Sequence, residues 1–204
     1  MAGSFAVPKQ DITGVILAGG LGRRMSADGS GINKAMVPFR GRPLIAHVIE
    51  RIRPQVAKLI INADPGDSTW RSFALPVIAD QVLERPGPLA GIHAALRAIH
   101  SEWLVCVPCD TPLLPYDLVV RLAAAQATID ADRVSVRCGN QAHPVIALLH
   151  SSLADELERY LSAGGRRIET WLSQGRWTEA HFEDEAAFVN LNTAHDLRHL
   201  EGTS

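Results

Sequence analysis

The chain has 204 residues, 47% of them hydrophobic and 21% charged, which is ordinary globular composition and too apolar for a disordered protein. Its 20 Lys and Arg residues against 22 Asp and Glu residues give a formal net charge of -2, which argues against nucleic acids as partners. Three cysteines do not make a disulfide framework, and neither a secretion signal nor an apolar run of roughly 20 residues is present. We therefore expect a cytoplasmic protein without a membrane partner, folded as one domain over 1–204 behind a flexible segment 1–12.

The first part of the chain alternates short β-branched runs with stretches of helical spacing. Strands are predicted at 13–17, 58–62, 76–79 and 103–107, and helices at 89–100 and 115–127. A further helix is expected to begin at Pro43, with Leu44, His47, Val48 and Ile52 on its inner face. Strands this apolar must be covered on both sides, which indicates a parallel sheet between two layers of helices.

The second part is less regular. Strands are predicted at 133–137, 143–149 and 177–181, and helices at 153–162, 168–174 and 194–200. The first two of these strands are joined across Gly139 and Asn140, so an antiparallel element is expected to join the sheet. The fold class is α/β, a single-domain, doubly wound, mostly parallel (mixed) sheet with helices on both faces.

Glycines and polar residues follow the predicted parallel strands where each strand ends. Gly19 and Gly20 follow the first strand, Asn62 ends the second, Asp80 follows the third, and Asp110 follows the fourth. Ligands of open parallel sheets bind at the carboxyl ends of the strands, where glycine lets the backbone approach phosphates and carboxylates can hold Mg²⁺. Asp110 could instead cap a helix or form a turn, and Asp80 could be a turn residue.

The segment 23–42 is locally cationic. It contains Arg23, Arg24, Lys34, Arg40 and Arg42 against the single acid Asp28. These charges favour binding of an anion with several phosphates, although a solvated basic surface is the alternative. Neither common phosphate motif is present, because Met25 replaces the third glycine of the dinucleotide fingerprint and Lys34 lies between Asn33 and Ala35 rather than in a P-loop.

Five motifs in order along the chain resemble one family. They are Leu17-Ala18-Gly19-Gly20-Leu21-Gly22-Arg23-Arg24-Met25, Asn33-Lys34, Gly87-Pro88-Leu89-Ala90-Gly91, Pro108-Cys109-Asp110-Thr111-Pro112 and Phe188-Val189-Asn190-Leu191-Asn192-Thr193. Together they resemble the molybdenum cofactor guanylyltransferases, nucleotidyltransferases of the nucleotide-diphospho-sugar transferase type. The resemblance implies transfer of GMP from GTP to the terminal phosphate of molybdopterin, with Mg²⁺ as cofactor and release of pyrophosphate. It also implies transient contact with a molybdenum-insertion protein or a molybdoenzyme chaperone.

The resemblance further implies the roles of individual residues. The nucleotide would contact Leu17, Ala18, Gly19, Gly20, Gly87, Pro88 and Leu89. Arg24 and Lys34 would hold its phosphates as catalytic residues, Asn62 and Asp80 would lie at the guanosine, Asp110 would bind Mg²⁺, and Asn190 and Asn192 would serve the pterin substrate. The nucleotide half would therefore span about 13–112 and the pterin half about 113–204. Two features depart from the family: Asn33 replaces the usual Asp, and the stretch 26–32 is longer than usual.

Some assignments stay open on the sequence alone. The same fold could use CTP, could act on a sugar phosphate, or could sense nucleotides without catalysis. Cys106 and Cys109 form an isolated C-x-x-C on a strand, which is more often coincidence than a metal or redox site. His143 could contact substrate or be structural, and Arg166 or Arg167 is a weaker candidate for an acidic ligand.

Overall fold

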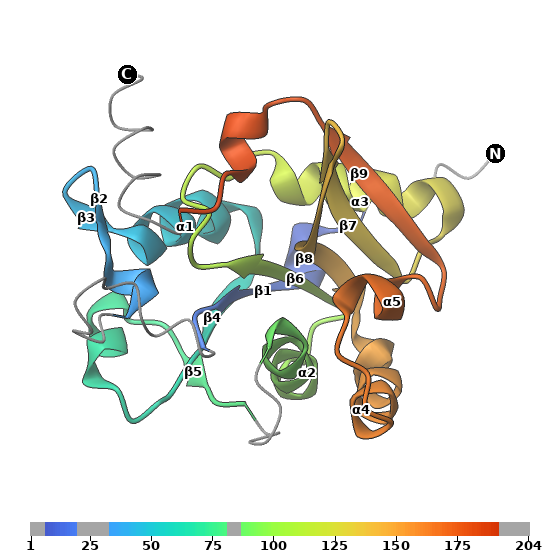
Figure 1. Cartoon of the computed structure of the whole chain (residues 1–204), viewed down its shortest axis with the longest axis horizontal. Helices are drawn as coiled ribbons and strands as arrows, with labels where there is room; N and C mark the ends of the chain where they lie inside the picture. The colour runs from blue at the N-terminus through green and yellow to red at the C-terminus, as the bar shows by residue number, and fades with distance from the viewer. Residues whose placement is uncertain (1–6, 20–32, 81–86, 192–204) are drawn as a thin grey trace.

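A seven-stranded sheet forms the centre of the computed structural model, which describes residues 7–19, 33–80 and 87–191 (Figure 1). Its strands are β1 (Ile12–Leu17), β4 (Lys58–Asn62), β5 (Val77–Ile78), β6 (Trp103–Pro108), β7 (Arg133–Cys138), β8 (Gln141–His150) and β9 (Trp177–Phe182), in the order β5-β4-β1-β6-β8-β7-β9. β5, β4, β1 and β6 are parallel neighbours. β8 is antiparallel to both β6 and β7, and β9 is parallel to β7, so the predicted mixed sheet is confirmed.

Helices cover both faces of this sheet, as the apolar strands require. On one face lie α1 (Leu44–Ile52) and α3 (Leu118–Ile129), and on the other lie α2 (Pro88–Ala98), α4 (Ala154–Ser162) and α5 (Ile168–Leu172) (Figure 1). Each layer has its own core, one with Val48 and Leu122 and the other with Ile92 and Leu157. Among the described residues, no helix is long and apolar enough to cross a membrane.

Small elements account for most differences from the predicted boundaries. A two-stranded hairpin, β2 (Pro38–Phe39) with β3 (Arg42–Pro43), precedes α1, and its turn has positive φ at Arg40 and Gly41. Short 3-10 segments occur at η1 (Lys9–Asp11), η2 (Lys34–Met36), η3 (Arg53–Gln55), η4 (Ser68–Phe73), η5 (Ser151–Leu153) and η6 (Glu185–Phe188). His47 is only half-buried, with its Nε2 2.8 Å from the carbonyl oxygen of Phe39. The helix predicted at 194–200 lies outside the described residues.

Candidate active site

The carboxyl ends of β4, β1 and β6 are tied together by backbone hydrogen bonds just beyond the sheet. The amide of Ala18 donates to the carbonyl of Asn62 at 2.9 Å, and the amide of Cys109 donates to the carbonyl of Leu17 at 3.2 Å. Three of the predicted site segments, which are far apart in the sequence, therefore meet at one edge of the sheet. This is the edge at which parallel α/β sheets bind ligands.

Lys34 and Asp110 form an ion pair at this edge. Asn33 caps η2 by accepting a hydrogen bond from the amide of Ala35 at 3.1 Å, which sets the position of Lys34 as the first residue of that turn. Lys34 Nζ pairs with Asp110 Oδ2, and both side chains are about 15% exposed. The Asp110 side chain does not cap α3, because that helix begins only at Leu118 and its N-cap residue is Asp117. Lys34 therefore reaches Asp110 despite the two departures from the family, the longer stretch 26–32 and Asn33 in place of Asp.

One carboxylate oxygen of Asp110 has no hydrogen-bond partner among the described residues. Its Oδ1 is buried and accepts no hydrogen bond from the residues that the structure describes. A buried, unsatisfied carboxylate oxygen is costly unless a ligand or cation meets it. Mg²⁺ is held by one or two carboxylates together with substrate phosphates, so a single aspartate of this kind fits such an ion. No group of three or more His, Cys, Asp or Glu residues suited to a metal exists within the described part of the chain.

Asn62, Asp80 and Gly91 form a second cluster, on the side of β4 that faces α2. The Asn62 side chain is 2% exposed, and its Nδ2 donates to Asp80 Oδ1 at 2.8 Å. A Cβ atom at Gly91 would lie 2.2 Å from Asn62 Oδ1 and 3.0 Å from a methyl group of Leu17. Asn62 therefore sits behind Asp80 and orients it, and the absence of a side chain at Gly91 makes room for the amide.

The first turn of α2 carries the predicted nucleotide residues Gly87, Pro88 and Leu89. Gly87 precedes the helix with φ of 148°, a conformation that favours glycine, and Pro88 occupies the first helical position. Leu89 is 2% exposed and packs in the core against β1 and β6 rather than standing open at the edge. The start of this helix carries a partial positive charge from the helix dipole, which favours anions.

The segment after η6 returns to Asp110. The amide of Leu191 donates to the carbonyl of Asp110 at 2.9 Å, and Thr111 Oγ1 donates to Asn190 Oδ1 at 2.7 Å. Asn190 itself is exposed, while Thr111 is fully buried. Thr111 and Gly91 were not singled out as site residues from the sequence, although both stand in the motifs that carried the resemblance. Gly20, Arg24 and Asn192 lie outside the described residues.

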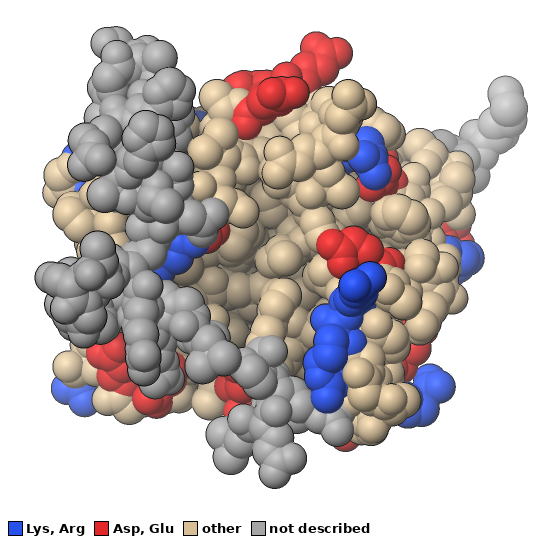
Figure 2. Space-filling view, viewed as in Figure 1, with Lys and Arg blue, Asp and Glu red and all other residues tan. Residues whose placement is uncertain are grey.

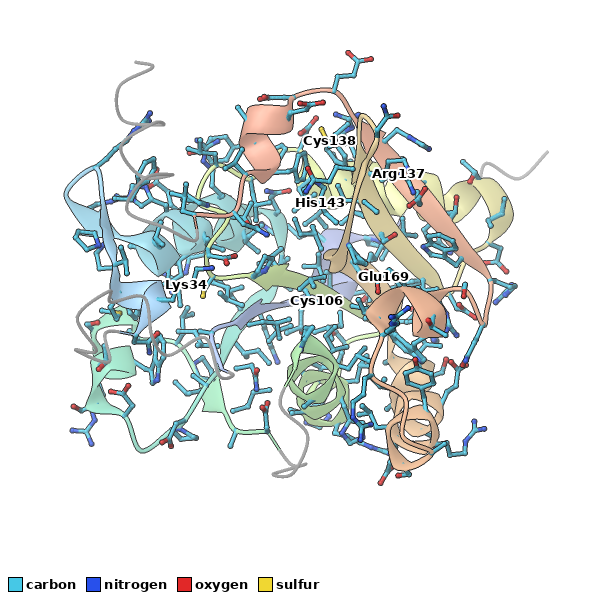
Figure 3. All side chains as sticks on the ribbon, viewed as in Figure 1. Lys34, Cys106, Arg137, Cys138, His143 and Glu169 are labelled. Carbon is cyan, nitrogen blue, oxygen red and sulfur yellow. The ribbon has the colours of Figure 1, made fainter. Side chains whose placement is uncertain are left out.

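The face that carries this edge is hollowed. Figure 2 shows a depression in its middle, and Figure 3, in the same view, shows Lys34 at its left border and His143 at its upper border. A smaller pocket of about 160 Å³ lies beside Gly19, and it is lined by Ala18, Gly19, Asn33, Ala63, Asp64, Asp67 and Trp70. Trp70 is a residue without a sequence signal, and its buried Nε1 has no hydrogen-bond partner within the described structure.

The remaining candidates from the sequence, Cys106, Cys109 and Arg166, lie in surroundings that suit a structural role. Burial raises the pKa of both Cys106 and Cys109 to about 12, so neither thiol is prepared for metal or redox chemistry. Arg166 donates to the carbonyl oxygens of Leu161 and Gly165 near the end of α4, so its guanidinium is engaged with the backbone there.

Comparisons with known proteins identify the family of the chain. A family model described as MobA-like NTP transferase domain matches residues 14–178. A molybdenum cofactor guanylyltransferase of Cupriavidus necator is 44% identical over 197 residues, covering 94% of this chain and 97% of the relative. The enzyme of the same name from Shewanella putrefaciens is 42% identical over 183 residues, covering 89% and 92%.

Solved structures share the fold as well. The crystal structure of molybdopterin-guanine dinucleotide biosynthesis protein A from Archaeoglobus fulgidus superposes with a TM-score of 0.74 at 27% identity, covering 94% of this chain and 97% of that one. A 4-diphosphocytidyl-2C-methyl-D-erythritol synthase from Anaerococcus prevotii superposes with a TM-score of 0.73 at 11% identity and covers 96% of both chains, which shows the fold alone. The chain therefore belongs to the molybdenum cofactor guanylyltransferase family of MobA-like nucleotidyltransferases.

Proposed function

We propose that this chain transfers GMP from GTP to the terminal phosphate of molybdopterin, forming the guanine dinucleotide cofactor and pyrophosphate. The observation that carries the proposal is the pair of Lys34 with Asp110, whose other carboxylate oxygen is buried and unsatisfied among the described residues. A cation and a metal-binding carboxylate at one point are what two polyanionic reactants need in order to approach each other. The high identity to guanylyltransferases over most of the chain supports GTP as the donor.

In this proposal Asp110 would hold Mg²⁺, because its Oδ1 is buried and has no hydrogen-bond partner among the described residues. When bound, the ion would neutralise phosphate charge and stabilise the departing pyrophosphate. Lys34 would contact the triphosphate from the same side, and Arg24 and the backbone at Gly19 and Gly20 would hold further phosphate oxygens. The first turn of α2, with Gly87, Pro88 and Leu89, would face the nucleotide together with Leu17 and Ala18.

No general base is needed for the transfer. The nucleophile is a phosphate monoester whose second pKa is about 6, so it is largely ionised near neutral pH. The task of the site is to align this phosphate with the α-phosphorus of GTP and to balance the charges. Asn190 and Asn192 would position the acceptor, because the segment that contains Asn190 is bonded to Asp110 and Thr111.

Asp80 would read the guanine. A carboxylate can accept from both the N1–H and the amino group of guanine, whereas adenine presents an acceptor at N1. Asp80 follows the edge strand β5 and is oriented by the buried amide of Asn62. We assign Asn62 an indirect role, through Asp80, because its own amide donates to that carboxylate.

The decisive experiment incubates the protein with Mg²⁺, α-labelled GTP and molybdopterin. The expected products are the labelled guanine dinucleotide and pyrophosphate in equal amounts. Parallel reactions with CTP test the nearest alternative, a cytidylyl transfer on the same fold. GTP binding without pyrophosphate release, in the presence of acceptor and Mg²⁺, would contradict the proposal and favour a nucleotide sensor.

The cellular setting completes the proposal. We expect the enzyme in the cytoplasm, with transient contacts to a molybdenum-insertion protein or to a chaperone of the receiving molybdoenzyme. We also propose that 1–204 is one functional domain, with the nucleotide half at about 13–112 and the pterin half at about 113–204.

A further inference from the structure

His143 lies on β8, beyond the last β6–β8 pair in the direction in which β6 ends. That pair joins Cys106 with Ala147; Asp110 follows Cys106 by four residues, and His143 precedes Ala147 by four. Between Ser135 and Val136 of β7 the partner in β8 jumps from Ala147 to His143, so residues 144–146 form a bulge. Bulges of this kind redirect side chains next to active sites. His143 is therefore past the pairing with β6 but still paired with Val136 of β7, one strand step beyond Ala147 toward the carboxyl end of β6.

An aromatic ring holds His143 in place. The imidazole packs on Phe188, with the ring centroids 5.3 Å apart and the planes inclined by 36°. Phe188 is 1% exposed, and Phe182 packs against it edge-on at 4.9 Å. Two residues after Phe188, the side chain of Asn190 accepts the hydrogen bond from Thr111, the neighbour of Asp110. His143 is therefore anchored on the same segment that closes against the metal-binding aspartate.

The polar atoms of His143 remain available in this packing. The residue is 9% exposed, no described residue hydrogen-bonds either ring nitrogen, and neither nitrogen is sealed from solvent. Burial lowers the pKa of His143 below its ordinary 6.5, so the ring is neutral at pH 7. A neutral imidazole offers one N–H donor and one nitrogen acceptor. Such a group suits an uncharged polar heterocycle better than a phosphate, which a cation binds more strongly.

The position in the sheet separates His143 from the guanine cluster. Asn62 and Asp80 follow β4 and β5, whereas His143 is on β8, and β1 and β6 lie between β4 and β8. Figure 3 shows Lys34 at the left border of the central depression and His143 at its upper border. A ligand group that meets His143 therefore belongs to the acceptor, with the phosphates lying between it and the nucleotide.

We propose that His143 is an acceptor-binding residue whose ring nitrogens hydrogen-bond the polar edge of the pterin, while Phe188 fixes the orientation of the imidazole. The inference rests on the proposed function, because it takes molybdopterin as the acceptor. It adds a specificity contact that Lys34 and Asp110 cannot supply, since those residues serve phosphate and metal.

The test compares three variants under steady-state conditions. His143→Phe keeps the aromatic packing on Phe188 and removes the hydrogen bonds, and His143→Gln keeps a donor and an acceptor. His150→Phe is the matched control, because His150 is on the same strand, packs edge-on against Trp103, and lies at the opposite edge of the sheet. Initial rates give KM for molybdopterin and for GTP separately, and thermal unfolding reports on folding.

We expect His143→Phe to raise KM for molybdopterin about tenfold while KM for GTP stays within about twofold. His143→Gln should recover part of the loss, and His150→Phe should change neither KM. An unchanged KM for molybdopterin in a folded His143→Phe variant would overturn the inference. Equal rises in both KM values, with a lowered unfolding temperature, would show packing alone and would overturn it too. If the wild type makes no guanine dinucleotide, the proposed function itself has failed.

Discussion

Asp110 is the residue on which the proposed chemistry depends most. Asparagine at this position keeps the shape and removes the negative charge, so Asp110→Asn should fold while binding Mg²⁺ poorly. We expect kcat to fall roughly 100-fold or more, because charge on the transferring phosphoryl group is no longer balanced. The rate at rising Mg²⁺ concentration measures the effect. Asp130→Asn is the control, since Asp130 is exposed and pairs with Arg176, outside the residues of the candidate site. A rate near that of the wild type would remove Asp110 from the metal site.

Base recognition gives a second prediction at this scale. Asp80→Ala removes the carboxylate that Asn62 orients, so guanine loses its partner for N1–H and the amino group. The ratio of affinities for GTP over ATP should drop about tenfold or more, because the wild-type site leaves adenine facing an acceptor. Calorimetric competition among GTP, ATP and CTP measures this ratio. Equal losses for all three nucleotides would mean that Asp80 supports the fold or the metal instead of reading the base.

At the scale of elements, α2 approaches β4 closely only because it contains a glycine. Gly91→Ala would put a methyl group 2.2 Å from Asn62 Oδ1, so the amide must move and its hydrogen bond to Asp80 must weaken. The expected result is weaker GTP binding with reduced selectivity for guanine. Gly14→Ala is a matched control, because its Cβ would lie 2.8 Å from Leu59 Cδ1 in the core, away from Asp80. If both variants lose stability equally and neither changes selectivity, Gly91 has no part in base recognition.

The sequence pattern predicts elements well where burial decides them. The strand at 58–62 is found as predicted, and β1, β6 and α4 differ by one residue at an end. The hairpin of β2 and β3 escapes prediction because each strand is two residues long and leaves no periodicity to detect. The predicted helix at 115–127 begins only at Leu118, since Pro115 and Tyr116 lie in the turn that precedes it.

Part of the candidate site could also be predicted from the sequence. Residues that end parallel strands, such as Asn62 and Asp110, could be foreseen because topology brings strand ends together. The contact of Asn62 with Gly91 could not, since it depends on the distance between α2 and β4. The bulge that redirects His143 depends in turn on how β8 pairs with two neighbours at once. Local patterns contain neither kind of information.

At the scale of the whole molecule, the helix layer that contains α2 and α4 holds a buried histidine. His93 of α2 is 3% exposed, and neither ring nitrogen has a hydrogen-bond partner in the described structure. Its Nε2 is 4.0 Å from a carboxylate oxygen of Glu158 on α4, while Arg97 pairs with both Glu158 and Asp155. Burial lowers the pKa of His93, and Arg97 lowers it further, against the opposing effect of Glu158.

This buried histidine makes stability depend on pH in a defined direction. Below the ordinary histidine pKa of 6.5, the unfolded chain takes up a proton that folded His93 resists. The free energy of unfolding should therefore decrease as the pH is lowered. His93→Leu removes this titration and keeps an apolar group between α2 and α4. The unfolding free energy of this variant should therefore decrease less steeply as the pH is lowered from 6.5 to about 5.

Denaturant unfolding of both proteins at a series of pH values measures the two slopes. Carboxylates that titrate in this range act on both proteins alike, and the two curves should run parallel above pH 7.5. Identical slopes below pH 6.5 would show that folded His93 gains its proton as easily as the unfolded chain does, through the nearby carboxylate of Glu158.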